Sequence, residues 1–315
     1  MRIVVPEHVD AEAIELLGAQ AQVVYDPRLH EDANALTEAL RDAAALIVRN
    51  KTFVGPDLLA QAPDLRVVGR VGVGLDNLDL PALRERRVVA TYAPGTNAVS
   101  VAEYVIGAIL EFRRGFARAS ASLHRGTWDR QAAIGGEAFG MTLGIVGLGD
   151  IGARLAHRAQ AFGMRILASD PAVHEGSLAV QEFGVELVAL DELLAASDVV
   201  SLHAPLVDAT RDLVNARTLA RMKPTAFLVN TARGGLVDED ALAEALREGR
   251  IAGAALDVRR QEPPGPDDPL RGLPNVILTP HVAGVTRESM RRASLHVAHD
   301  VLRVLRGERA VSVVG

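Results

Sequence analysis

The sequence contains no cysteine, which excludes disulfide bonds, thiolate nucleophiles and cysteine-based metal sites. Lysine is almost absent too: only Lys51 and Lys223 occur, so arginine supplies 32 of the 34 basic residues (34 − 2). No apolar run approaches the roughly 18 residues that a membrane-spanning helix requires. The net charge is −6, and residues of like charge form no continuous block. Nothing therefore favours nucleic acid or an anionic membrane as a partner.

Apolar residues are what the sequence has in abundance. They make up 49% of the 315 positions, which is enough to bury the core of one large or two medium domains. The first residues, 1–6, have the pattern of a strand rather than of a signal peptide. We therefore expect a soluble protein located in the cytoplasm.

A glycine-rich turn near the middle of the chain is the strongest single motif. An apolar run at 143–146 predicts a buried strand, and a helical pattern begins at Ala153. Between them, three glycines follow G-x-G-x-x-G spacing: Gly147, Gly149 and Gly152. Strand, turn and helix in this order are typical of a dinucleotide-binding site, because the helix N-terminus offers unpaired N–H groups to phosphates. Glycine-rich turns are common, so the surrounding sequence has to support this interpretation.

An acidic residue at the end of the next predicted strand supplies that support. Asp170 closes the apolar segment 164–170 and lies 23 residues after Gly147 (170 − 147). A carboxylate at about this distance binds the ribose hydroxyls, and it repels a 2′-phosphate, so it favours NAD over NADP. The alternative is an Asp-Pro turn with a solvated carboxylate.

Short apolar strands alternate with helical patterns on both sides of this motif. The alternation predicts parallel sheets that helices cover on both faces. A final helical pattern over 286–306 is expected to return to the first domain. The expected fold class is α/β: two Rossmann-like or flavodoxin-like domains with parallel sheets and a cleft between them. We assign residues 1–98 plus 286–315 to a substrate domain and residues 99–285 to an NAD-binding domain.

Polar residues follow several predicted strands of the second domain, which is where ligands bind in open α/β sheets. Arg233 lies in a turn with two glycines, and its planar guanidinium suits a carboxylate, although a surface arginine is an alternative. Glu262 is expected to have an extended backbone because it precedes Pro263. The alternative interpretation is a solvated acid in a proline-rich loop. His281 follows a strand and a proline and is also expected in an extended segment. Histidine is the usual group for proton transfer near neutral pH.

Two features outside these turns are open to more than one interpretation. The turn Gly72-Val73-Gly74 either offers N–H groups to a small anion or is a purely structural turn. A helical pattern over 101–117, with a capping-box pattern at Ser100–Glu103, is apolar on more than one side. Such a helix indicates a domain hinge, a subunit interface or a large core.

Two groups of residues are not interpreted as sites. His296 and His299 lie at i, i+3 spacing on the last predicted helix, but no third ligand accompanies them, so we predict no metal site. The single tryptophan, Trp128, lies in segment 118–140, which is predicted to be irregular. We interpret this side chain as a packing anchor.

Taken together, the motifs resemble those of the D-isomer-specific 2-hydroxyacid dehydrogenases. This family includes phosphoglycerate, glycerate/hydroxypyruvate and D-lactate dehydrogenases. The resemblance covers essentially the whole chain. It rests on these segments: Val71–Asn77, Val101–Glu103, Gly147–Gly152 with Asp170, Leu202–Leu206, Asn230–Gly235, Leu256–Val258 with Glu262-Pro263, and Pro280-His281.

The resemblance implies roles for particular residues. The implied catalytic residues are Arg233, Glu262 and His281. The residues implied to line NAD are Gly147, Gly149, Asp150, Ile151, Gly152, Asp170, Pro205, Thr231, Ala232, Arg233, Asp257, His281 and Gly284. Those implied to bind the substrate are Asn50, Gly72, Val73, Gly74, Arg233 and His281. The family is usually dimeric, and the apolar helix near 101–117 fits a homodimer interface.

The chain departs from the family pattern in two places. Arg259 and Arg260 stand where an aromatic residue and an acid are common, and Gly284-Val285 stands where many members carry a tryptophan or a serine. Both changes are expected at the rim of the active site. They therefore bear on the identity of the substrate and not on the chemistry.

The expected activity is the NAD-dependent interconversion of a D-2-hydroxy acid and its 2-oxo acid. Hydroxypyruvate, glyoxylate or a compound like 3-phosphoglycerate are the expected substrates. Positive charge in the run Arg49-Asn50-Lys51, in the expected substrate loop, favours a second anionic group on the substrate. The alternatives are an NADH-sensing regulatory protein on the same fold and a formate or phosphite dehydrogenase.

Overall fold

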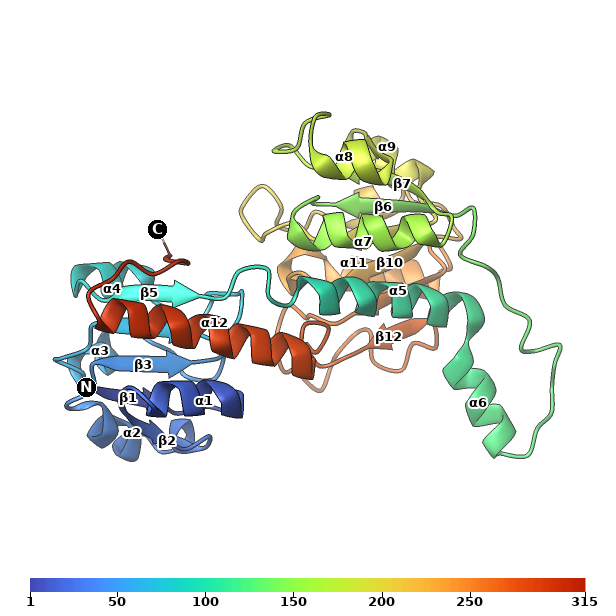
Figure 1. Ribbon diagram of the computed structural model, residues 1–315. Coiled ribbons are helices and arrows are strands. Elements are labelled where there is room, and N and C mark those ends of the chain that lie inside the picture. Colours follow the sequence, from blue (N-terminus) through green and yellow to red (C-terminus); the bar gives the residue numbers. More distant parts are fainter. Residues whose placement is uncertain (315) are drawn as a thin grey trace. The chain divides into compact units, whose positions relative to one another are not determined.

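The computed structural model describes residues 1–314 and divides the chain into two compact units (Figure 1). Unit 1 consists of residues 1–97 together with the chain from Val285 onward, and unit 2 consists of Ala98–Gly284. Each unit is built on one sheet in which all strands are parallel. The α/β fold class expected from the sequence is therefore confirmed.

The sheet of unit 1 has five strands. They are β1 (Arg2–Val5), β2 (Gln22–Tyr25), β3 (Ala45–Val48), β4 (Val67–Arg70) and β5 (Val89–Tyr92). Their order is β2-β1-β3-β4-β5, the arrangement of flavodoxin-like folds. All four residues of β3 are buried, which explains why the central strands are continuous apolar runs and not alternating ones.

Helices cover both faces of this sheet. They are α1 (Ala11–Gly18), α2 (Ala33–Leu40), α3 (Pro56–Ala60), α4 (Leu80–Glu85) and α12 (Arg287–Leu305), with a 3-10 turn, η1, at Leu29–Glu31. Helices α1 and α12 pack on one face through side chains such as Leu17 and Val297. Helices α2, α3 and α4 pack on the other face.

Helix α12 begins with a capping box. The hydroxyl of Thr286 accepts a hydrogen bond from the N–H of Ser289, and the hydroxyl of Ser289 accepts one from the N–H of Thr286. These two bonds satisfy donors that the first turn of a helix leaves without partners. The helix therefore begins within a residue of the predicted position.

The chain after α12 returns to the edge of the sheet. The carboxylate of Asp300, which is 1% exposed, accepts hydrogen bonds from the N–H groups of Val311 and Ser312 at 2.7 and 2.8 Å. Val313 then forms an antiparallel bridge with Thr91 of β5. One buried carboxylate thus holds the tail against both α12 and the sheet.

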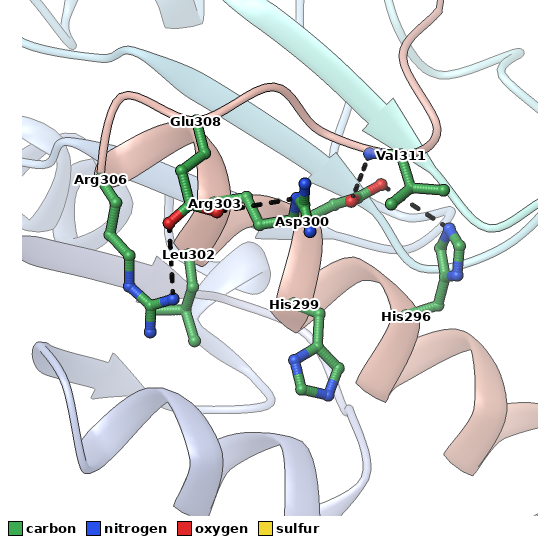
Figure 2. Close-up of a pocket in the computed structure, with 8 residues that line it drawn as sticks. All are labelled: His296, His299, Asp300, Leu302, Arg303, Arg306, Glu308 and Val311. Carbon is green, nitrogen blue, oxygen red and sulfur yellow. Dashed lines mark hydrogen bonds and ion pairs between the residues drawn. The ribbon is translucent and has the colours of Figure 1, made fainter.

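A cavity of about 260 Å³ lies beside α12 and the tail (Figure 2). Its charged side chains pair with one another. Glu308 lies 3.9 Å from both Arg303 and Arg306, and His296 lies 3.7 Å from Asp300. Because these charges compensate each other, we assign no ligand to this cavity.

The sheet of unit 2 has seven strands. They are β6 (Thr142–Val146), β7 (Arg165–Ser169), β8 (Val185–Leu187), β9 (Val199–Leu202), β10 (Phe227–Asn230), β11 (Gly253–Leu256) and β12 (Val276–Leu278). Their order is β12-β11-β10-β9-β6-β7-β8. The strand order reverses between β6 and β9, and ligands bind outside the carboxyl ends of the strands at such a point.

Two layers of helices enclose this sheet. The helices are α5 (Ala98–Arg114), α6 (Phe116–His124), α7 (Asp150–Ala161), α8 (Leu178–Phe183), α9 (Leu190–Ala196), α10 (Ala216–Leu219) and α11 (Glu239–Arg247), with a 3-10 turn, η2, at Gly234–Leu236. Helices α5, α7 and α8 pack on one face, and α9, α10 and α11 pack on the other. On the α5 face, Phe112 stacks on Phe227 with 4.1 Å between the ring centroids.

Helix α5 differs from its prediction. The expected capping box at Ser100–Glu103 is wrong, because the helix begins at Ala98 and Ser100 is buried inside its first turn. The helix also ends earlier than expected, at Gly115, whose φ of +59° is left-handed. Its most apolar face packs on α7 and the sheet within unit 2.

The segment that follows α5 also differs from its prediction. It is not wholly irregular, because α6 extends to His124. Trp128 is 78% exposed, so its interpretation as a packing anchor inside the chain is wrong. The segment exposes five large apolar side chains: Phe116, Leu123, Trp128, Ile134 and Phe139. No helix within residues 1–314 combines the length and apolar character needed to cross a membrane.

Candidate active site

The glycine turn lies between β6 and α7, at the carboxyl edge of the sheet of unit 2. Gly147 has a φ of +94°, and a Cβ atom there would lie 2.8 Å from the backbone N of Ala204. A Cβ atom on Gly152 would lie 2.3 Å from the carbonyl oxygen of Gly147. At Gly149 a Cβ atom would meet nothing within 4 Å, which leaves open space beside the backbone. The turn is therefore shaped for close packing at two glycines and for approach of a phosphate at the third.

Asp170 stands one residue after β7 and reaches the glycine turn. Its Oδ2 accepts a hydrogen bond from the N–H of Leu148 at 2.8 Å, and its Oδ1 accepts one from the N–H of Ala172 at 2.8 Å. These bonds fix the carboxylate beside the turn. Each oxygen has a second lone pair, so both can still accept from ribose hydroxyls.

Other residues expected to line NAD have distinct surroundings. Asp150 and Ile151 open α7, and Asp150 pairs with Arg154 one turn later. The hydroxyl oxygen of Thr231 is buried and has no hydrogen-bond partner within residues 1–314. A buried hydroxyl without a partner is uncommon in a folded chain, and a bound ligand is one partner that such a group can take. This orphaned hydroxyl and the open glycine turn both fit a bound dinucleotide.

A half-buried histidine follows β9 next to the turn. The Nε2 of His203 lies 2.9 Å from the hydroxyl of Ser201, and burial lowers the pKa of His203 to about 4. The ring is therefore neutral near pH 7. Pro205, two residues later, continues the same post-strand segment.

The acid and the histidine predicted from the sequence come together. The Nδ1 of His281 lies 2.7 Å from Oε2 of Glu262. Both side chains are partly exposed, at 53% and 39%. A carboxylate bonded to one ring nitrogen fixes the orientation of the ring and favours the tautomer whose other nitrogen can accept a proton.

The backbone at His281 is not extended, so this expectation is wrong. His281 has a φ of +55°, in the left-handed region, and its N–H donates to the carbonyl of Asp257 at 2.8 Å. The cause is the carboxylate of Asp257, which is 1% exposed and accepts from the N–H groups of Val282 and Ala283 at 2.8 Å each. The chain turns back at His281 because both of these donors converge on one carboxylate.

Helix α5 also supports this turn. The hydroxyls of Tyr104 and Thr279 lie 2.6 Å apart, and Thr279 donates to Oδ1 of Asp257 at 2.5 Å. Desolvation raises the pKa of Tyr104 above its usual value, so its hydroxyl stays protonated. Three side chains thus hold the segment that carries His281.

Arg233 lies on the turn after β10. The side chain of Asn230, which is fully buried, bridges this turn: its Nδ2 donates to the carbonyl of Arg233 at 2.9 Å, and its Oδ1 accepts from the N–H of Ala232 at 3.1 Å. A Cβ atom on the next residue, Gly234, would lie 1.9 Å from the carbonyl carbon of Arg259. The Arg233 turn therefore packs directly on the backbone of the loop that carries Glu262.

Arg259 and Arg260 are both engaged in ion pairs. Arg259 is 9% exposed, and its guanidinium is paired with Glu239 and Asp268. Arg260 is exposed, but its guanidinium pairs with Asp212. The first arginine is therefore largely buried within unit 2, and it also lines the cavity that opens beside Glu262 and His281.

A cavity of about 440 Å³ in unit 2 opens beside Glu262 and His281. Its other walls are mostly apolar and include Pro263, Leu278 and Pro280. The pair thus lies on the wall of this cavity. Within residues 1–314 no three acidic or histidine side chains are grouped as metal ligands.

The residues of unit 1 that were expected to bind substrate lie on two loops. Asn50 is exposed on the loop after β3, and its N–H donates to Oε2 of Glu7 at 3.1 Å. Gly72 lies after β4 with a φ of +149°, and its N–H donates to the carbonyl of Arg70 at 2.9 Å. The N–H of Gly72 is therefore engaged within the chain. Any anion at this turn would use Val73 and Gly74.

Comparison with known proteins shows to which family the chain belongs. Residues 106–283 match the family model described as "D-isomer specific 2-hydroxyacid dehydrogenase, NAD binding domain". The (S)-sulfolactate dehydrogenase of Chromohalobacter salexigens is 46% identical over 98% of this chain and 99% of its own length. The chain belongs to the D-isomer-specific 2-hydroxyacid dehydrogenase family.

Two further members of this family illustrate its range. The D-3-phosphoglycerate dehydrogenase of Methanocaldococcus jannaschii is 42% identical over the whole of this chain, which spans 59% of that protein's length. The structure of the NADPH-dependent glyoxylate/hydroxypyruvate reductase of Sinorhizobium meliloti, in complex with citrate, superimposes with a TM-score of 0.87 at 32% identity, covering 100% of this chain and 97% of that one. As a member of the family, the chain is an NAD-dependent 2-hydroxyacid dehydrogenase, and its cofactor is NAD.

Several residues that shape the site were missed by sequence reasoning. They are Glu7, Tyr104, Glu239, Asp268 and Thr279. Two of them could have been found from their place in the sequence. Glu239 begins the helix that follows the Arg233 turn, and Thr279 directly precedes Pro280-His281. Nothing in the local pattern marks the other three, whose partners are distant in the sequence.

Proposed function

We propose that this dehydrogenase oxidises a D-2-hydroxy acid to its 2-oxo acid and catalyses the reverse reduction, with Arg233, Glu262 and His281 as its catalytic residues. The observation that carries this proposal is the 2.7 Å contact between Nδ1 of His281 and Glu262. It leaves Nε2 as the ring atom that exchanges a proton with a substrate hydroxyl.

The roles of the three residues follow from charge and proton balance. NAD held at the turn Gly147–Gly152 and Asp170 would supply the acceptor for the hydride on C2 of the hydroxy acid. His281 takes the hydroxyl proton during oxidation and returns it during reduction, while Glu262 stabilises the imidazolium that forms. Arg233 binds the substrate carboxylate and polarises the oxygen on C2, because its guanidinium offers donors in a planar fork.

Unit 2 is proposed as the NAD-binding domain, within the assigned residues 99–285. The proposed cofactor contacts are those implied by the sequence: the turn residues Gly147 to Gly152, Asp170, Pro205, Thr231 to Arg233, Asp257, His281 and Gly284. The open space at Gly149 and the orphaned hydroxyl of Thr231 support this assignment. Asp257 acts indirectly, since its carboxylate is engaged with the backbone at 282–283.

Unit 1 is proposed as the substrate domain, within residues 1–98 plus 286–315. Its proposed substrate residues are Asn50 and the turn Gly72-Val73-Gly74. The carboxylate of Glu7 receives four consecutive N–H groups, from Arg49 to Thr52, at 3.0–3.1 Å. The loop is thus held in one conformation and presents the side chains of Arg49, Asn50 and Lys51 outward.

A substrate with a second anionic group, such as a sulfonate or a phosphate on C3, agrees best with this cationic loop. Relatives named for sulfolactate and for phosphoglycerate share 46% and 42% identity with the chain. The two names carry different stereodescriptors, but the two compounds have the same configuration at C2. Sulfur on C3 outranks the carboxyl carbon in the naming rules, so D-configured sulfolactate carries the descriptor S. The configuration at C2 therefore does not distinguish between the two compounds as substrates of the proposed site.

The test is NADH consumption with five 2-oxo acids: sulfopyruvate, phosphohydroxypyruvate, hydroxypyruvate, glyoxylate and pyruvate. The proposal expects the first two to have the highest kcat/KM. If hydroxypyruvate or glyoxylate is the best substrate, the second anionic group is not what the loop recognises. Tight NADH binding without turnover of any compound would favour a sensor. Formate oxidation removes no hydroxyl proton, so the Glu262–His281 pair argues against it.

We also propose a homodimer. The apolar face of α5 is used within unit 2, whereas residues 116–139 expose Phe116, Leu123, Trp128, Ile134 and Phe139. Exposed apolar side chains grouped on one segment indicate a protein–protein contact. Light scattering after size-exclusion chromatography is expected to give twice the mass of the chain. The variant Trp128→Ser with Ile134→Ser is expected to shift the protein toward monomer.

A further inference from the structure

The loop that carries Glu262 has an unusual anchor. Residues 259–269 contain no helix and no strand, and Arg259 is the one residue among them that is buried. The apolar anchors of the loop lie just outside this stretch, at Val258 and Leu270, which are 1% and 0% exposed. Within the stretch, the buried side chain is a charged one.

The guanidinium of Arg259 is clamped between two carboxylates. Its Nη1 and Nη2 donate to Asp268 at 2.8 and 2.7 Å, and its Nε and Nη2 donate to Glu239 at 3.2 and 2.9 Å. The side chains of the three residues are only 7%, 3% and 14% exposed, in the order Arg259, Asp268, Glu239. Two bidentate contacts in a desolvated setting fix both the position and the plane of the guanidinium.

Arg259 and Asp268 are both charged near neutral pH. The hydrogen bond from Arg259 lowers the pKa of Asp268 to about 2, and the same bond raises the pKa of Arg259. Removing one member of such a buried group leaves an uncompensated charge, so the three residues act as a unit.

The backbone of Arg259 connects this unit to the catalytic pair. The N–H of Arg259 donates to Oε1 of Glu262 at 2.9 Å, while Oε2 of Glu262 faces His281. One oxygen of Glu262 is thus bonded to Arg259 and the other to the histidine. On its other side, the backbone of Arg259 touches Gly234, which follows the proposed catalytic Arg233.

We propose that Arg259 is a positioning residue that sets the orientation of the Glu262 carboxylate toward His281. It acts through its backbone N–H, which the Glu239–Arg259–Asp268 cluster holds in place. This inference rests on the proposed function, because it matters for catalysis only if Glu262 and His281 exchange protons with the substrate. The cluster adds an anchor that is specific in direction to the apolar anchors Val258 and Leu270.

The first test compares Arg259→Met with a control variant, Arg165→Met. The control removes an exposed ion pair between Arg165 of β7 and Glu186 of β8. We expect Arg259→Met to lower kcat by about 10-fold while the Kd for NADH changes by less than about 2-fold. The pH profile of kcat/KM is expected to change in the same way as in Glu262→Gln. Equal kcat values and pH profiles for Arg259→Met and Arg165→Met would overturn the proposal.

The second test is a double-variant cycle. If Arg259 acts through Glu262, adding Arg259→Met to Glu262→Gln lowers kcat by less than about 2-fold further. A merely structural role would make the two losses multiply, and that outcome would overturn the proposal. If Glu262→Gln alone retains the wild-type kcat, the proposed function itself fails, and the cycle reports this separately.

A milder variant covers the case in which Arg259→Met does not fold. Asp268→Asn keeps the size of the side chain and the contact of Arg259 with Glu239 but removes one charge. It is expected to lower kcat by about 3-fold, with the pH profile again displaced as in Glu262→Gln. An unchanged kcat and pH profile in folded Asp268→Asn would contradict the proposal.

Discussion

The Nδ1 atom of His281 lies 2.7 Å from Oε2 of Glu262, although the two residues are 19 positions apart in the chain. Two separate devices produce this contact. The carboxylate of Asp257 draws the backbone at 282–283 inward and turns it at His281, and the N–H of Arg259 holds the other oxygen of Glu262. The pair is therefore aligned by the chain before any substrate arrives.

Replacing the histidine tests the chemistry directly. His281→Ala is expected to lower kcat by at least about 10²-fold, because no other group then takes the hydroxyl proton. The Kd for NAD, measured by fluorescence titration, is expected to stay close to the wild-type value. Near-normal turnover in this variant would contradict the proposed mechanism.

Asp170 is expected to set the choice of dinucleotide. Asp170→Asn keeps an acceptor for the N–H of Leu148 but removes the negative charge beside the ribose. The Kd for NAD should rise about 10-fold, and the preference for NAD over NADP should fall, since repulsion of a 2′-phosphate is lost. Asp191→Asn, which breaks an exposed ion pair with Arg221, is the matched control. An unchanged ratio of the two Kd values would show that another residue makes the discrimination.

Two glycines in helices provide a steric test of the cofactor turn. Gly152→Ala in α7 places Cβ 2.3 Å from the carbonyl oxygen of Gly147, whereas Gly107→Ala in α5 meets nothing within 4 Å. Alanine favours a helix by about 1 kcal/mol over glycine, so Gly107→Ala should raise the melting temperature slightly. Gly152→Ala should lower it and weaken NADH binding. Equal shifts in the two variants would mean that the turn at Gly147 tolerates displacement.

Glu7 makes the stability of unit 1 depend on pH. Burial alone raises its pKa, but the N–H groups of Arg49, Thr52 and Lys51 outweigh burial and leave the pKa below the usual 4.5. A carboxylate with a lowered pKa in the folded state stabilises the protein above its unfolded pKa, and this stabilisation is lost as the pH falls through the folded pKa. Glu7→Gln should therefore cost about 2 kcal/mol at pH 7, because its amide group cannot accept from all four donors.

The measurement for Glu7 is urea unfolding of wild type and Glu7→Gln at several pH values. The gap between their unfolding free energies should be constant near neutrality and shrink as the pH falls below about 4.5. Glu38→Gln is the control, since Glu38 forms an exposed i, i+3 pair with Arg41. A gap that does not change with pH would show that charge at Glu7 is unimportant.

The parts of the site that depend on local backbone geometry could be predicted from the sequence. The spacing of Gly147, Gly149 and Gly152 predicts the turn, and at Gly147 and Gly152 no larger residue fits the backbone contacts. The apolar runs that alternate with helical patterns predict the parallel sheets. Arg233, Glu262 and His281 were found because each follows a strand, and the structure brings the last two into contact.

The parts that depend on partners far away in the sequence could not be predicted. Arginine is a residue type that usually lies at the surface. Arg259 is buried because it pairs with Glu239 and Asp268, which are 20 and 9 positions away. The left-handed backbone of His281 arises from a carboxylate 24 positions earlier (281 − 257), which local pattern cannot reveal. Ser100 fitted a capping box, yet the helix begins two residues before it and Ser100 is buried inside the first turn.

The loop held by Glu7 has a practical consequence. It carries Lys51, which is exposed, while the other lysine, Lys223, lies 2.8 Å from the carboxylate of Asp198. An amine-directed dye used sparingly should therefore attach, besides the N-terminus, mainly at Lys51. Because lysine is scarce, Lys51 is a suitable attachment site for a fluorescent reporter. Its emission would follow substrate binding without any engineered cysteine.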